Sequence, residues 1–298
     1  MTGHCLPHRH HQLDFFVADI IDAAHKADIA SMEHPLFALK AGDRRVRTYT
    51  RNSLTVTIKP GNDGCATIFD KDFWIFGTSQ LIEAINRGRT DTRSVIRFTA
   101  HEFLLATNRS TTGVGYQRMI KALGRLAGTR IETNIATHGQ RERAGFGLID
   151  SWRVIECDHN NRMVAVEICF PDWLWRSIKA RQVLTLHPDY FRLRKPLERR
   201  IYELARKHCG KQPKWHINLI NLHEKSGSTA SLREFRRQIR ALADSNILPE
   251  YRVVFDTDAD QVVFHNQNRK IVQEKINVLM DKTKKTIPRP KRVPETSE

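Results

Sequence analysis

The feature that most constrains the fold of this chain is an order of elements that its local patterns predict twice, although the sequence itself does not repeat. Each time, a helix is followed by a short strand, a short helix, a turn, a longer helix and two strands that can pair. This order is typical of a winged helix-turn-helix. We therefore expect an α+β protein with two winged helix-turn-helix domains in tandem.

The first copy begins with alternating residues that predict a strand at 54–58. Asp70 is a suitable N-cap for the helix that follows. Thr99 and Glu102 have the spacing of a capping box, which starts the short helix. The other predicted elements are strands at 96–98 and 130–135, a turn with Gly113 and Gly115, a longer helix at 116–127, one returning strand at 146–156, a strand at 164–170 and a helix at 171–181.

The second copy begins at Pro196, a residue favoured at the first position of a helix. Ser231 is the expected N-cap of its longer helix, which runs over 232–244. The other predicted elements are the first helix at 197–208, a strand at 215–217, a short helix at 219–225, a turn at 226–228 and paired strands at 251–255 and 261–264.

These patterns divide the chain into four parts. We expect a flexible, His-rich segment at 1–12, two winged-helix domains at 13–181 and 182–268, and a basic tail at 269–298. No run of about 18 uncharged apolar residues occurs, and no secretion signal is evident at the start of the sequence. The five scattered cysteines have no C-x-x-C spacing, which favours neither zinc nor disulfides and fits the cytoplasm.

The charge of the chain indicates a polyanionic partner. With 49 Lys and Arg against 33 Asp and Glu, the net charge is +16. Such a charge attracts nucleic acid or an anionic membrane surface. The basic residues lie on predicted amphipathic helices without a large spare apolar face, so we expect nucleic acid and no membrane partner.

The helix at 232–244 has the two faces that a DNA-reading helix needs. One stripe is apolar and comprises Leu232, Phe235, Ile239 and Leu242. The other is basic and comprises Arg233, Arg236, Arg237 and Arg240. Like charges on one face repel by roughly a few tenths of a kcal/mol per pair, and phosphates or guanine would relieve this. We expect these arginines to bind DNA; a merely solvated face is the alternative.

The longer helix of the first copy offers a second candidate surface. Its expected DNA-binding residues are Thr111, Thr112, Gln117, Arg118, Lys121 and Arg125, followed by Arg130 at the start of the first pair of strands and Arg141 and Arg143 in the loop between them. Asn108, Arg109 and Ser110 add donors for phosphate. A dimer interface or a solvated face is the alternative. The acidic tip of the second pair of strands, Asp256 to Asp260, is expected to avoid phosphate.

Three segments resemble the replication initiator protein A family of bacterial plasmids. They are RFTAHEFLLATNRSTTGVGYQRMIKALGRLAGTRIETNI, GFGLIDSW and DYFRLRKPLERRIYELARKHCG. The resemblance runs from about residue 12 to residue 266. It implies a cytoplasmic initiator that binds repeated double-stranded sites at its origin and promotes origin opening. By analogy with other iteron-binding initiators it also implies monomer–dimer exchange, repression of its own gene, and contacts with a host initiator and the replicative helicase.

Two other functions compete with this one. A winged-helix repressor would bind one inverted repeat, whereas an initiator binds tandem direct repeats beside an AT-rich region. A rolling-circle nickase needs two metal-binding histidines around a hydrophobic residue and a nucleophilic tyrosine. His8 and His10 flank Arg9 instead, and no such pair accompanies Tyr190 or Tyr202. No P-loop motif occurs either. We expect no catalysis, no cofactor and no metal.

Overall fold

The computed structural model describes residues 15–51, 54–134, 136–137, 140–141, 144–157, 162–268 and 273. The segment at 1–12 lies outside these residues, as does the tail at 269–298 apart from residue 273.

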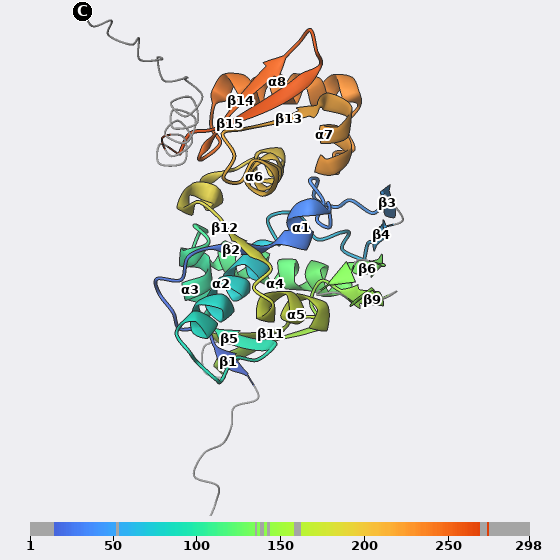
Figure 1. Ribbon diagram of the computed structural model, residues 1–298. Helices are drawn as coiled ribbons and strands as arrows, with labels where there is room; N and C mark the ends of the chain where they lie inside the picture. The colour runs from blue at the N-terminus through green and yellow to red at the C-terminus, as the bar shows by residue number, and fades with distance from the viewer. Residues whose placement is uncertain are drawn as a thin grey trace, which may run out of the picture.

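The protein is a mixed α+β structure in which both predicted orders of elements are present (Figure 1). The first part of the chain forms β1 (Phe16–Val17), β2 (Lys26–Asp28), α1 (Ile29–Glu33), β3 (Arg47–Arg51), β4 (Leu54–Lys59), α2 (Asp72–Asn86), β5 (Val95–Phe98), α3 (Ala100–Ala106), α4 (Gly113–Gly128), β6 (Arg130–Thr133), β7 (Ala136–Thr137), β8 (Gln140–Arg141), β9 (Ala144–Gly147), β10 (Ser151–Cys157), β11 (Arg162–Cys169) and α5 (Asp172–Lys179). The second part forms β12 (Val183–Thr185), the 3-10 helix η1 (Pro188–Arg192), α6 (Pro196–His208), β13 (Lys214–Asn218), α7 (Leu219–Ser226), α8 (Leu232–Ser245), β14 (Tyr251–Asp256) and β15 (Gln261–Asn266).

Two four-stranded sheets enclose the first core. One has the strand order β3-β4-β6-β9 and the other has the order β1-β5-β11-β10. Helix α2 is buried on almost every side, which explains why apolar residues occur on all its faces and why its buried Ser79 and Gln80 are hydrogen-bonded. Its Trp74 indole donates a hydrogen bond of 2.8 Å to the Leu148 carbonyl. The capping box predicted for Thr99 and Glu102 is present at the start of α3.

The prediction of one returning strand at 146–156 is wrong, because the chain leaves one sheet and enters the other. Strand β9 pairs with β6, whereas β10 pairs with β11. The bend lies at Gly147, where a Cβ atom would sit 2.5 Å from the Ile149 carbonyl oxygen. Leu148 and Ile149 are buried between the sheets and hold the bend in place. Strand β5 therefore pairs with β11 and not with the β6–β9 hairpin.

Two local predictions about helix starts are also corrected. Helix α4 begins at Gly113, so Gly113 and Gly115 belong to its first turn. A Cβ on Gly115 would lie 1.9 Å from the Ser110 carbonyl oxygen, so this first turn packs directly on the preceding loop. Asp70 is not the N-cap of α2; that position is Lys71, without a side-chain cap. The Asp70 carboxylate accepts from the Thr67 backbone amide instead.

The second unit has a three-stranded sheet with the order β13-β15-β14, in which β13 pairs with β15, the second strand of the following hairpin. The apolar stripe predicted for α8 faces the core, where Phe235, Ile239 and Leu242 are buried. Ser231 caps α8, as predicted, by accepting from the Glu234 amide. Gly227 ends α7 with φ +68°, and a Cβ there would lie 2.5 Å from Pro35. The α7–α8 turn therefore packs closely on the first part of the chain.

The second core also takes in residues from the start of the chain. Ala27, Met32 and Ile75 belong to it, together with the apolar residues of α6. Helix α1 packs on α6. The boundary at 181/182 stays a prediction, but the two parts share a buried junction.

Charged side chains occupy this junction, although it is almost closed to solvent. Arg199 donates to Asp72 over 2.6 Å, and the Lys71 ammonium lies 2.8 Å from the Glu203 carboxylate. All four side chains are at most 3% exposed. The Tyr190 hydroxyl also donates to Glu203 over 2.8 Å. A buried charge is tolerated only when it is paired and hydrogen-bonded, so these contacts require α2 and α6 to meet in one arrangement.

Arg200 extends the junction to two helix ends. Its two terminal nitrogens donate to the carbonyls of Met32 and Glu33 at the end of α1 and of Lys225 at the end of α7. Carbonyls at a helix C-terminus have no partner in the helix and carry partial negative charge, which a guanidinium satisfies. One side chain of α6 therefore connects the first unit to the helix that precedes α8.

The junction yields a stability prediction. Asp72→Asn leaves Arg199 buried without its carboxylate, and we expect a loss of about 3–5 kcal/mol in the free energy of unfolding. The control is Asp91→Asn, which breaks an exposed pair with Arg89 and should cost less than about 1 kcal/mol. Urea unfolding followed by circular dichroism measures both. Equal losses in the two variants would show that the junction does not carry this energy.

Candidate nucleic-acid interface

Helix α8 presents its arginines on the side away from its buried stripe. Arg233 and Arg240 are exposed, and the Arg240 guanidinium lies 5.4 Å from the centre of the Phe255 ring. Because the opposite side holds Phe235 and Ile239 in the core, the helix cannot turn these arginines away without exposing apolar surface. The cationic side is therefore directed to solvent by the packing of the helix.

Two of the four arginines have carboxylate partners. Arg236 forms a bidentate pair with Asp260 of the β14–β15 turn, with distances of 3.2 and 2.9 Å. Arg237 forms one with Glu234, at 2.8 and 2.7 Å. The hydrogen bond from Arg237 holds the pKa of Glu234 below its ordinary value, so this carboxylate is charged at neutral pH. The sequence placed Asp260 on an acidic tip and gave no sign that it reaches α8.

Helix α4 carries the second group of candidates. Thr111, Thr112, Gln117, Arg118, Lys121 and Arg130 are all exposed. Within the described residues, Arg118 and Lys121 form no ion pair, so both charges are available to a partner. Thr112 is the N-cap of α4 but makes no side-chain cap hydrogen bond. The helix therefore starts with backbone N–H groups that could donate hydrogen bonds to a phosphate.

Two residues expected to reach DNA are held inside the first unit instead. Arg125 binds Asp70 through two hydrogen bonds of 2.8 Å, and these raise its pKa above the ordinary value. Arg109 donates to Asp72 over 2.7 Å and so adds to the junction. Both carboxylates lie far away along the chain, so spacing on one helix could not reveal these pairs.

The remaining candidates are less defined. Arg143 lies outside the described residues. For Arg141 the structure gives the backbone, which is part of β8, but not the position of its side chain. Both stay predictions.

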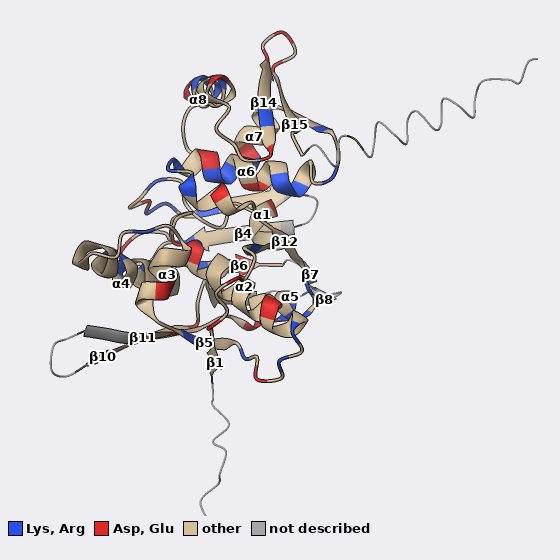
Figure 2. Cartoon of the chain, turned by 90° about the vertical axis from the view of Figure 1, so that its left-hand side faces the viewer, with Lys and Arg blue, Asp and Glu red and all other residues tan. Residues whose placement is uncertain are grey.

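The two candidate helices lie on the same side of the molecule. Figure 2 shows α8 at the upper left and α4 lower on the same side. Helix α6, which forms the junction, lies at a height between them. A single duplex along this side could meet both helices. This arrangement depends on α6, because its buried ion pairs with Lys71 and Asp72 fix the position of the second unit relative to the first.

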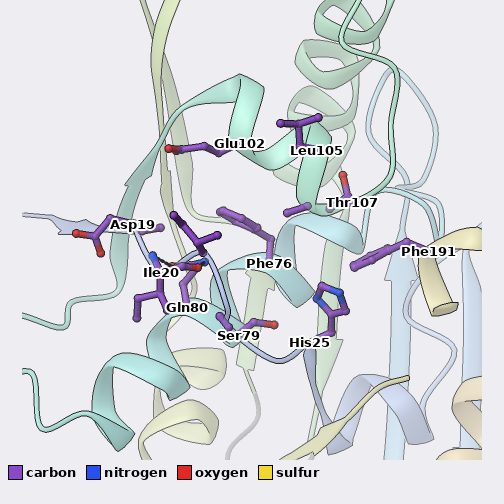
Figure 3. Close-up of a pocket in the computed structure, with 14 residues that line it drawn as sticks. Asp19, Ile20, His25, Phe76, Ser79, Gln80, Glu102, Leu105, Thr107 and Phe191 are labelled. Carbon is purple, nitrogen blue, oxygen red and sulfur yellow. Dashed lines mark hydrogen bonds between the residues drawn. The ribbon is translucent and has the colours of Figure 1, made fainter. Parts of the chain in front are cut away.

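A pocket of about 430 Å³ lies elsewhere in the first unit, between residues 18–25 and helices α2 and α3 (Figure 3). Its polar groups serve the fold. The Gln80 amide makes two hydrogen bonds with the backbone of Ile20, and the Ser79 hydroxyl donates to the Ile75 carbonyl. The His25 ring packs edge-to-face against Phe191, and burial lowers the pKa of His25. These groups hold the 18–25 segment on α2.

The described residues contain neither a cluster of metal-binding side chains nor a membrane-spanning helix. In them, no three His, Cys, Asp or Glu side chains come together closely enough to hold a metal ion. None of the helices described in full is both long and apolar enough to cross a bilayer.

Comparison with known proteins identifies the family. The family described as replication initiator protein A matches residues 26–253. A protein of Wigglesworthia glossinidia brevipalpis, named as a replication protein, is 40% identical over 254 residues, which cover 84% of this chain and 92% of that protein.

Solved structures of RctB domains 2 and 3 resemble the fold. One has a TM-score of 0.56 at 9% identity and covers 80% of this chain and 98% of that one. A second has a TM-score of 0.51 at 10% identity and covers 83% and 99%. At such low identity the likeness concerns the fold alone. The family match spans most of the sequence, and the chain therefore belongs to the replication initiator protein A family.

Proposed function

We propose that this initiator binds repeated double-stranded sites at a plasmid origin through α8 and α4, and that this binding promotes origin opening. The observation that carries the proposal is the placement of two basic helices along one edge of the molecule. Their charges point outward because each helix buries its apolar side. The net charge of +16 adds long-range attraction to DNA.

We further propose that both units act as winged helix-turn-helix domains. In the second unit, β13 pairs with the β14–β15 hairpin, which supports this reading. In the first unit the order of elements is the same, but β5 pairs with β11. There the hairpin β6–β9 continues a different sheet, so this unit would be a variant of the fold.

The roles of the individual side chains follow from their positions. Arg233 and Arg237 lie in the exposed N-terminal half of α8, where a recognition helix meets base edges. Arg236 would read bases with the guanidinium held in place by Asp260. Arg240, Arg118 and Lys121 would bind phosphates. Repression of its own gene, monomer–dimer exchange and contacts with a host initiator and helicase complete the proposal, by analogy with other initiators.

The second candidate function is a repressor of the same fold. The same surface would serve it, and only the arrangement of DNA sites separates the two. Catalysis is not part of the proposal.

Binding should depend strongly on salt. If about 8–12 phosphates are contacted, the slope of log affinity against log salt concentration should be near −7 to −11. Titration of a labelled duplex at several salt concentrations measures it. A slope shallower than about −3 would mean that the basic face does not contact DNA.

Single arginines of α8 should differ in their effects. Arg236→Ala or Arg237→Ala should weaken binding to the origin repeat by roughly ten- to a hundredfold and reduce discrimination at one base pair, because a base contact is lost. Arg240→Ala should weaken repeat and scrambled duplex alike and lower the salt slope by about one. Paired titrations with both duplexes measure these effects.

Arg194→Ala is the matched control, since Arg194 is exposed but lies on neither helix. Thermal unfolding should hardly change in any of these variants. If every α8 variant bound the origin repeat with the affinity of the wild type, the first unit would have to recognise the DNA sequence.

The chain should not cut DNA. Supercoiled origin plasmid incubated with the protein and Mg²⁺ or Mn²⁺ should stay closed on an agarose gel. A nicked product with protein attached through a tyrosine would contradict the proposal and favour a rolling-circle mechanism.

A further inference from the structure

The outer face of the β13–β15–β14 sheet carries a row of basic side chains. In the register of the sheet, Lys214 lies opposite His265, and His265 lies opposite Arg252. All three are exposed, and the alternating pattern directs them away from the core. His216 lies two residues further along β13 on the same face.

Like charges that lie close together on one face of a sheet repel each other. Burial and the nearby Lys214, His216 and Arg252 lower the pKa of His265, so at pH 7 the charges of this row are those of Lys214 and Arg252, one on either side of the imidazole. In the described part of the chain, Lys214 and Arg252 form no ion pair. A row of this kind is relieved by an anionic partner.

Carboxylates of the same face do not neutralise the row. Asp256 is four residues from Arg252 on β14, which is about 13 Å along a strand. Its carboxylate is also occupied by the amides of Asp258 and Ala259. The face is therefore basic at one end of the sheet.

The next row of the face is apolar on two of its three strands. Val254 is 39% exposed and lies opposite Val263, which lies opposite His216. A basic row beside an apolar row fits a segment that offers carboxylates together with aliphatic side chains. DNA phosphates offer no aliphatic counterpart to Val254.

The position of the face separates it from the proposed DNA surface. Figure 1 shows the sheet in front and α8 behind it, and Figure 2 shows α8 and the β14–β15 hairpin on different sides of the unit. A partner on the outer face could be bound while α8 contacts DNA.

We propose that the outer face of the β13–β15–β14 sheet, around Lys214, His216, Arg252 and His265, is a docking surface for an acidic segment of a partner protein. The segment binds while DNA occupies the opposite side. This surface is additional to the DNA-binding function and does not depend on it.

The test uses a fluorescein-labelled decaglutamate peptide as the acidic probe, with decaglutamine as the uncharged control. Fluorescence anisotropy measures binding of each peptide to the full chain, alone and saturated with origin duplex, so that the DNA-binding helices are masked. We expect decaglutamate to bind in both cases and decaglutamine in neither. The variant K214E/R252E should lose at least roughly tenfold in affinity for decaglutamate and bind duplex like wild type.

Two further variants separate the explanations. K40E/R194E makes the same change of charge at exposed sites outside the sheet and should leave peptide binding unchanged. R233E should weaken duplex binding and leave peptide binding unchanged, so failure of the DNA proposal and failure of this one give different patterns. Thermal unfolding checks that each variant is folded, and K214Q/R252Q replaces the reversal if it is not.

Undiminished decaglutamate binding by K214E/R252E would overturn the proposal. The proposal would also be overturned if duplex displaced the peptide and K214E/R252E bound duplex more weakly than the wild type. That result would show that this face binds DNA.

Discussion

The buried ion pairs between α2 and α6 are the constraint on which the rest of the structure depends. The pairs Arg199–Asp72 and Lys71–Glu203 are almost closed to solvent. Water therefore cannot solvate a charge that loses its partner. A change in the angle between the two units would leave charges unpaired in a medium of low dielectric constant. The relative position of α4 and α8 therefore depends on the contacts between α2 and α6.

A second constraint acts within α8. The helix must bury one side, so its arginines are exposed whether or not DNA is present. Repulsion among them is reduced in the free protein by Glu234 and Asp260. On DNA, phosphates and base edges would compete for the same guanidinium groups. Glu234 orients Arg237 at little cost in accessibility, because Arg237 stays largely exposed, whereas Arg236 beside Asp260 is half-buried.

Much of this fold could be predicted from the sequence, because its signals are local. Capping residues such as Thr99 and Ser231, and the apolar stripes of α4 and α8, act over a few residues and gave the correct elements. The strand change at Gly147 could not be predicted, since it depends on pairing with distant strands. The same holds for Arg125, whose partner Asp70 is 55 residues away, and for the junction formed by Asp72 and Arg199.

Helices α4 and α8 are proposed to read repeated sites along one face of a duplex. Hydroxyl-radical footprinting of the DNA that flanks the protein's own gene shows which sequences the protein covers. We expect tandem, directly repeated protections beside an AT-rich region, with two successive major grooves covered in each repeat. A single inverted repeat would favour the repressor, and the absence of any protected sequence at moderate salt would contradict specific binding altogether.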